Sequence, residues 1–466
     1  MTRAREWTIA AAVIIVSVVV IAVVVVNRRM EREVSSGIYV PKPAKITPEI
    51  ILLQQYVRID TSNPPGNEMP GAQWLGAQLR AAGIPYEIIE TAPRRANLYA
   101  RIRGKRTGEG LLLHNHIDVV PATREGWDLP PFSADIRINQ LFGRGSIDMK
   151  SIALCELEAF IAVAHSGRAP ERDVVYLATA DEEVGSNFGV RWLLAHRPDI
   201  FDGIKYALTE GGVTEMAKEQ VTYFGIETGS KQIVSVDLLA DDVATLQRAR
   251  IGLEPYFRPD HPDRVLPGVR SFFRAVAPQR LDSQKPLEDI DGTIAAGKFW
   301  LIPLTMRQLM QNNIWARSIR HAPDGRVAME VDLANLPDED PDRRLEWLAG
   351  KARELGVTVG PVTRKDGPAP ISPDDTPLFA LISREVRKEF GNIPVGPEVL
   401  ALSTSDARFL RPHGMICYGL QPFPLDFFQS LTIHGLNERV RLDWYMSGME
   451  MMKRVVTAYA SAAPGT

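Results

Sequence analysis

Apolar residues change their spacing along the first part of the chain. Residues 46–59 and 72–83 repeat apolar positions with helical spacing. Residues 111–120 and 173–180 contain short unbroken apolar runs, which are typical of strands buried on both faces of a sheet. Residues 148–167, between these two strands, carry apolar residues all along the segment and predict a helix. The strand–helix–strand order predicts an α/β fold with a mostly parallel sheet flanked by helices.

The pattern changes from about residue 226. Residues 232–239 and 326–337 read as strands, and each is followed by a segment with helical spacing, at 241–253 and 343–356. This arrangement predicts a smaller α+β domain, in which a four-stranded, ferredoxin-like sheet is backed by two helices.

The smaller domain is expected to interrupt the larger one. Residues 254–300 are rich in Pro, Asp and Arg and predict long loops, and a helix–strand pattern resumes after residue 374. We therefore predict an α/β domain in two parts, 47–225 and 369–466, with an inserted α+β lid domain at 226–368.

The amino terminus differs in kind from the rest of the chain. Nineteen residues from Thr8 to Val26 carry no charge, and arginines flank them on both sides. A transmembrane helix needs roughly 20 apolar residues. A cleaved signal peptide is the alternative, but the apolar part is too long and no small-x-small cleavage site follows it. We expect residues 1–46 to form a single-pass membrane anchor and linker, and the side of the membrane stays open.

Composition narrows the candidate chemistry. An apolar content of 45% and a charged content of 24% are those of a folded globular protein. A net charge of −3 and the lack of a long basic run argue against nucleic acid as a partner. Cys155 and Cys417 are the only cysteines, so any metal site must be built from His, Asp and Glu.

Acidic residues and histidines follow the predicted strands. In open α/β sheets, ligands bind beyond the carboxyl ends of the strands. The residues at these positions are His114, His116, Asp118, Asp181, Glu182, Glu183 and Glu210, and Asp148 begins the predicted helix. One acid after a strand is commonly a cap or a solvated loop residue, but crowded carboxylates repel one another unless a cation neutralises them. The cluster therefore predicts a metal site, although alternation along the strand cannot choose between His114 and His116.

Five ordered motifs resemble one enzyme family. They are "HNHIDVVP", "GRGSIDMK", "ADEEVGS", "TEGG" and "TIHGLNERV", with further matches at "VRIDTSNPPGNE" and "TSDARF". Together they span about residues 47–460. They resemble the di-zinc exopeptidases and deacylases that include aminoacylase-1, glutamate carboxypeptidase, carnosine dipeptidase and succinyl-diaminopimelate desuccinylase.

The resemblance implies a zinc-exopeptidase-like fold with two Zn²⁺ ions, which Co²⁺ or Mn²⁺ could replace. His116 and Glu210 would bind one ion, Glu183 and His434 would bind the other, and Asp148 would bridge them. This assignment makes His116, not His114, the ligand from the first strand.

The family pattern also implies catalytic roles. Asp118 would hydrogen-bond the far nitrogen of His116 and fix its tautomer. Glu182 would be the general base for a metal-activated water that attacks an amide carbonyl. His114 reads as a buried, hydrogen-bonded histidine.

The inserted domain departs from the family. Relatives often carry a histidine that reaches the active site, but the corresponding residues 234–249 contain none, and Ala334 stands where relatives often have an arginine. Asn312 and Asn313 resemble a substrate-binding segment. Arg408 could bind a substrate carboxylate or form a structural salt bridge.

We therefore expect a membrane-anchored zinc hydrolase that cleaves small peptides or N-acyl amino acids. The alternative is a catalytically impaired zinc-binding protein of the same fold that acts in ligand or partner binding. A homodimer through the lid domain is also implied by the resemblance.

Overall fold

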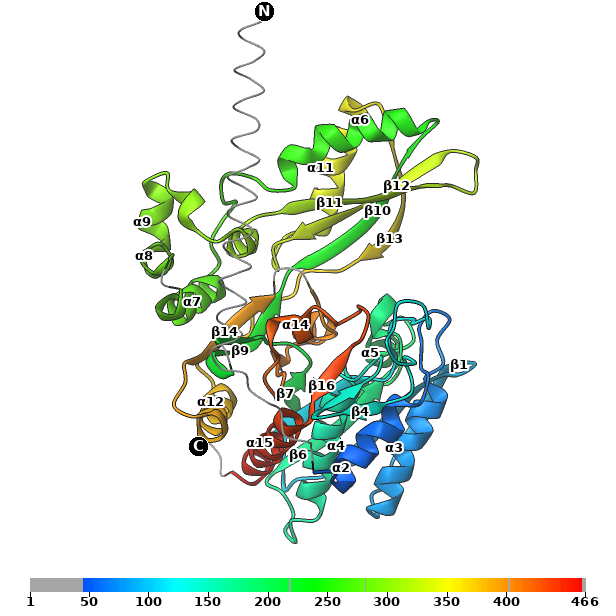
Figure 1. Cartoon of the computed structure of the whole chain (residues 1–466), viewed down its shortest axis with the longest axis vertical. Helices are drawn as coiled ribbons and strands as arrows, with labels where there is room; N and C mark the ends of the chain where they lie inside the picture. The colour runs from blue at the N-terminus through cyan, green and yellow to red at the C-terminus, as the bar shows by residue number, and fades with distance from the viewer. Residues whose placement is uncertain (1–44, 218, 281, 401–402, 463–466) are drawn as a thin grey trace, which may run out of the picture. The chain divides into compact units, whose positions relative to one another are not determined.

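The computed structural model describes residues 45–217, 219–280, 282–400 and 403–462 (Figure 1). The expected anchor at Thr8–Val26 lies outside these residues. Within the described ranges, no helix is both long and apolar enough to cross a membrane.

A nine-stranded sheet forms the core of the larger domain. Eight strands run in the order β1 (Glu87–Ala92), β2 (Arg95–Ile102), β6 (Arg172–Thr179), β3 (Arg106–His116), β7 (Ile204–Thr209), β15 (Ile416–Gly419), β9 (Gln220–Ser230) and β14 (Val395–Leu400), and β8 (Thr214–Ala217) pairs with β9. The central strands β6, β3, β7 and β15 are parallel. β1, β2 and β8 pair antiparallel with their neighbours, and β15 also meets β9 antiparallel. The expected mostly parallel sheet is therefore mixed, because short connections such as the one joining β1 to β2 permit only antiparallel pairing.

Helices cover both faces of this sheet. Leu111 and Leu113 of β3 belong to one hydrophobic core, while Leu112 between them belongs to another on the opposite face. The first core is completed by α2 (Pro48–Val57), α3 (Met69–Ala81), α4 (Lys150–Ala164), α12 (Pro377–Phe390) and α15 (Leu442–Ser461). The second is completed by α5 (Val190–His196) and α13 (Ala407–Leu410). Burial on both faces explains why β3 and β6 lack the apolar–polar alternation of a half-exposed strand.

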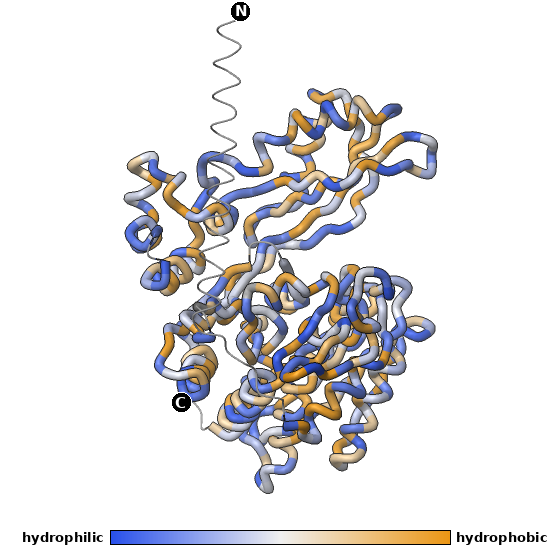
Figure 2. Tube along the Cα trace, in the orientation of Figure 1, coloured by the Kyte–Doolittle hydropathy of each residue, from blue (hydrophilic) through white to orange (hydrophobic). Residues whose placement is uncertain are grey.

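The predicted insert contains the expected four-stranded sheet with two helices. The strand order is β11 (Asn313–His321), β12 (Val327–Asn335), β10 (Gln232–Ala240) and β13 (Thr358–Lys365), and all pairs are antiparallel. α6 (Val243–Leu253) and α11 (Pro341–Glu354) share a hydrophobic core with this sheet. Hydrophobic residues recur through the strands of both sheets (Figure 2).

The segment expected to form long loops contains helices, so that prediction is wrong. They are α7 (Pro267–Val276), α8 (Gln284–Glu288), α9 (Ile290–Ala295) and, just beyond the segment, α10 (Leu304–Arg307). Val269, Phe272, Phe273 and Val276 of α7 form a third core with Val399 of β14. Their spacing is helical, but prolines and charges between the short helices obscured the signal.

Candidate functional site

Five side chains gather into two groups that could each hold a metal ion. His116, Asp148 and Glu210 form one group, and Asp148, Glu183 and His434 form the other. Asp148 Oδ1 lies 3.0 Å from His116 Nε2, and Asp148 Oδ2 lies 3.0 Å from His434 Nε2. Glu210 Oε2 lies 3.5 Å from His116 Nε2, and Glu183 Oε2 lies 3.1 Å from His434 Nε2. The structure thus brings all five expected ligands together, with Asp148 shared between the groups.

The parallel strands position three of these side chains. His116 ends β3, Glu210 directly follows β7, and Glu183 lies in the short 3₁₀ turn (Glu182–Val184) just after β6. β3 pairs in parallel with both β6 and β7. The carboxyl ends of these strands therefore meet at one edge of the sheet, where ligands bind in open α/β folds.

Glu438, which the sequence analysis did not single out, positions the loop that carries Asp148. Its carboxylate is buried and accepts hydrogen bonds from the backbone N–H groups of Ile147 at 2.7 Å and Asp148 at 3.2 Å. Arg144 Nη1 donates to the same carboxylate at 2.6 Å. Since Glu438 and His434 share the "TIHGLNERV" motif, this one segment supplies a candidate ligand and supports another.

The contact between Asp118 and His116 differs from the expected one. His116 Nδ1 hydrogen-bonds the backbone carbonyl oxygen of Asp118 at 2.8 Å, while Asp118 Oδ1 lies 3.6 Å away. The Asp118 carboxylate accepts hydrogen bonds from Asn63 Nδ2 at 2.8 Å and from the backbone N–H groups of Glu182 at 3.1 Å and Glu183 at 3.2 Å. The carbonyl therefore fixes the tautomer of His116, and the carboxylate holds the turn that carries both glutamates.

Glu182 lies beside the candidate ligands but belongs to neither group. Its Oε1 accepts a hydrogen bond from Arg408 Nη1 at 2.8 Å, and Arg408 Nε lies 3.4 Å from Asp366 Oδ1. The structure therefore shows the salt-bridge alternative for Arg408, with the expected general base as its partner.

Burial and crowding set the charge of the cluster. Burial raises the pKa of Glu183 to about 7, with the charge of Asp148 adding to the rise, and burial raises the pKa of Glu210 well above its usual range. Hydrogen bonds to Asp148 and Glu183 raise the pKa of His434 to about 11. Buried carboxylates this close together favour a divalent cation, and imidazole with carboxylate is a donor set that suits Zn²⁺ as well as neighbouring transition metals.

His114 lies outside both groups. It is buried, its Nε2 lies 3.0 Å from Thr179 Oγ1, and burial lowers the pKa of its imidazole to about 3. A neutral histidine packed between strands agrees with the reading from the sequence.

The structure does not bring Asn312 and Asn313 to the site. Asn312 Oδ1 accepts a hydrogen bond from the backbone N–H of Leu336 at 2.9 Å, and Asn313 Oδ1 accepts one from Lys231 Nζ at 2.6 Å. Both amides hold parts of the lid domain together, and neither lines the cavities beside the metal groups.

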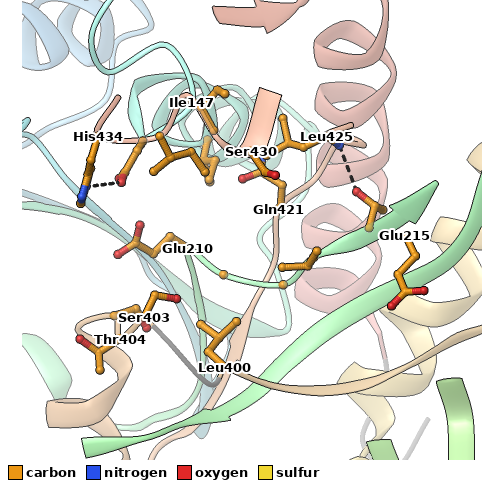
Figure 3. A pocket seen from close by; sticks show the side chains of 18 of the residues that line it. Ile147, Glu210, Glu215, Leu400, Ser403, Thr404, Gln421, Leu425, Ser430 and His434 are labelled. Atoms are coloured by element: carbon orange, nitrogen blue, oxygen red, sulfur yellow. Dashed lines mark hydrogen bonds and ion pairs between the residues drawn. The ribbon is translucent and has the colours of Figure 1, made fainter. Parts of the chain in front are cut away.

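Two cavities meet at the candidate centre. Glu182, Glu183 and His434 line both of them. The first, of about 540 Å³, extends along Gly211–Met216 (Figure 3). The second, of about 590 Å³, lies against the lid and is lined by three arginines, Arg317, Arg364 and Arg408. The two lid arginines could not be predicted from the sequence, because they lie on opposite edge strands of the lid sheet and line one cavity only after the chain has folded.

Comparisons with known proteins agree with this geometry. The family described as "Peptidase family M20/M25/M40" matches residues 112–458. Aminoacylase-1A of Rattus norvegicus is 26% identical over 437 residues, covering 91% of this chain and 98% of the relative. The M20 family metallo-carboxypeptidase Sso-CP2 from Sulfolobus solfataricus has a similar fold, with a TM-score of 0.68 at 15% identity, covering 89% of this chain and 100% of that one. Human carnosine dipeptidase 1 has a TM-score of 0.66 at 14% identity, covering 88% and 96%.

Proposed function

This chain belongs to peptidase family M20/M25/M40 and is a metal-dependent hydrolase of amide bonds, and we propose that it cleaves N-acyl amino acids or small peptides with two zinc ions. The observation that carries the proposal is the pair of metal groups sharing Asp148, with Glu182 beside them and uncommitted to either. The aminoacylase and dipeptidase names of the relatives support the substrate class.

The chain supplies a complete set of metal donors. His116 and Glu210 would hold one ion, His434 and Glu183 the other, and Asp148 both. When bound, divalent cations polarise an amide carbonyl and lower the pKa of a water molecule.

In this proposal Glu182 moves the proton. Its backbone is held by Asp118 and its Oε1 by Arg408, which leaves Oε2 to take a proton from the attacking water. Glu182 then gives this proton to the leaving amine nitrogen as the amide C–N bond breaks. Glu183, the next residue, would bind a metal ion. The same turn therefore supplies one carboxylate that binds metal and one that is available for proton transfer.

The lid can contribute to substrate binding without the histidine and arginine that relatives often carry. Arg317 and Arg364 face the second cavity and retain partly exposed side chains. Guanidinium groups there would bind the carboxylate of an amino acid or peptide.

The test uses the full chain purified in detergent. We expect two zinc ions per chain and turnover of N-acyl amino acids or dipeptides, and we expect Glu182→Gln to lose turnover while it retains both ions. Two bound zinc ions without turnover of any amide would contradict the proposal and favour the catalytically impaired binding protein.

Membrane anchoring by Thr8–Val26 is a separate proposal, supported by nineteen uncharged positions between arginines. The full chain should resist extraction from membranes by alkaline carbonate. Placing arginines at Ile14 and Val18 should release it, and extraction of the unaltered chain would contradict the anchor.

A further inference from the structure

The first cavity continues past the metal residues along the segment that follows Glu210. Gly211 and Gly212 have φ angles of 121° and 84°, a conformation that favours glycine, so the chain turns sharply directly after Glu210. The turn brings Val213–Met216 along the cavity. Figure 3 shows Glu210 and His434 on one side of this space and Glu215 on the other, with Leu400 and Leu425 between them.

The lining between the two ends is uncharged. Among the described lining residues, every charged side chain belongs either to the metal end or to an ion pair between Arg280 and Glu215. The apolar side chains of the lining are those of Ile147, Ile152, Val213, Met216, Leu400, Leu425 and Ile433, and uncharged polar side chains such as those of Thr214, Gln421 and Ser430 lie among them. Ligand pockets lined in this way bind the apolar part of a ligand, and a few polar groups fix its orientation.

Two buried polar atoms in the lining lack a partner within the described part of the chain. They are Gln421 Nε2 and Ser405 Oγ, and both side chains are more than nine-tenths buried. A buried polar group without a hydrogen bond is costly. Both atoms are enclosed by the protein rather than exposed to the cavity, so it is the side chains of the lining that indicate the class of occupant.

We infer that this cavity binds the acyl group of an N-acyl amino acid and that the acyl group is an extended aliphatic chain. This inference rests on the proposed function. The chain lies along the apolar lining toward Arg280 and Glu215.

The experiment measures kcat/KM of the full-length zinc protein for the acetyl, butanoyl, hexanoyl and octanoyl derivatives of one amino acid. Burial of a methylene is expected to raise kcat/KM roughly threefold to fourfold for each added methylene, until the cavity is filled. Values that stay flat or fall from acetyl to octanoyl would overturn the inference while leaving the proposed function intact. Failure of the whole series with cleavage of unacylated dipeptides would also overturn it, and no amide turnover at all would defeat the proposed function itself.

Two matched variants test whether the dependence of kcat/KM on acyl chain length arises from this cavity. Leu425→Gln places a polar group in the lining and should lower the octanoyl-to-acetyl ratio of kcat/KM about tenfold. Leu431→Gln makes the same exchange six residues away, at a side chain that is 61% exposed and lines neither cavity. The control should leave the ratio unchanged. Equal ratios in both variants would contradict the assignment of this cavity, whatever the chain-length series shows.

Discussion

Arg408 donates a hydrogen bond from Nη1 to Glu182 Oε1 across 2.8 Å, which joins a candidate substrate-binding residue to the residue expected to move the proton. Both side chains are largely buried, at 4% and 10% exposed. A charge-assisted bond in such surroundings orients the carboxylate more firmly than a surface pair would.

Removal of this contact should slow the reaction. Arg408→Met removes the partner that orients Glu182, while Asp366 keeps its ion pair with Arg364, so we expect kcat to fall roughly 10- to 100-fold. Arg408→Lys keeps the charge but loses the planar fork, and should restore only part of the rate. The measurement compares kcat and KM for substrates with and without a free carboxylate. An equal loss for both identifies Arg408 as a positioning residue for Glu182, and a loss confined to carboxylate substrates would show that it binds them directly.

Substitutions of the adjacent residues Glu182 and Glu183 should have different effects on catalysis and metal binding. Glu182→Gln should reduce kcat by about 10²- to 10⁴-fold, because proton transfer is lost while the metal donors remain. Glu183→Gln should bind one metal ion fewer, because its carboxylate lies in the group with Asp148 and His434. Metal analysis of the purified variants beside their kinetics distinguishes the two. Loss of metal from Glu182→Gln would reverse the assignment.

Substitutions of His114 and His116, the two histidines of β3, should also differ in their effects on metal content and stability. His116→Ala should empty one metal position, because its Nε2 faces Asp148 and Glu210. His114→Ala should retain both ions and lower the free energy of unfolding by about 1–3 kcal/mol, because Thr179 loses a buried hydrogen-bond partner. Metal content and denaturant unfolding are measured on each variant. If His114→Ala alone removes metal, the choice of His116 is wrong.

Glu438 should govern metal affinity without touching the metal. Glu438→Gln weakens the acceptor that holds the backbone of Ile147 and Asp148 and loses the ion pair with Arg144. Supporting interactions of this kind typically change metal affinity by about 10- to 100-fold, so competition with a chelator should release metal from this variant at lower chelator concentration. Unchanged affinity would show that the loop keeps its shape without Glu438.

The buried carboxyl group of Glu156, which contacts Asn115 of β3, should make the stability of the protein depend on pH. Burial raises the pKa of Glu156 to about 8, while a hydrogen bond from Asn115 opposes the rise. The folded state therefore binds the proton more tightly than the unfolded chain, so this contribution is complete below pH 4.5 and is lost as pH rises toward 8. The free energy of unfolding should fall by up to roughly 1.4 kcal/mol per pH unit in this window, relative to Glu156→Gln. Parallel denaturant curves at pH 5 and pH 8 test it, and identical pH dependence in both proteins would contradict it.

The ligands could be predicted because each lies in a short motif at the end of a strand or helix. The expectation that parallel strands end at one edge was enough to predict the cluster, but the family resemblance was needed to choose His116 over His114 and Glu183 over Glu182. The lid sheet was also accessible, because its strands and helices each carry their own apolar period. The helices between residues 267 and 307 were missed because each is short and contributes to a hydrophobic core shared with residues of β9 and β14, which lie far away in the sequence.

The sequence by itself determined the family, and the motifs that carry the family resemblance supplied the five candidate metal donors and the separate roles expected of Glu182 and Glu183. Those properties reside in residue type and local spacing. Only the tertiary structure decided that Arg408 pairs with Glu182, that Glu438 supports Asp148, that Asn312 and Asn313 stay within the lid, and that Leu400 and Leu425 share a cavity with Glu210. Each of these relationships joins segments far apart in the chain or depends on how strands align, and neither composition nor periodicity records such contacts.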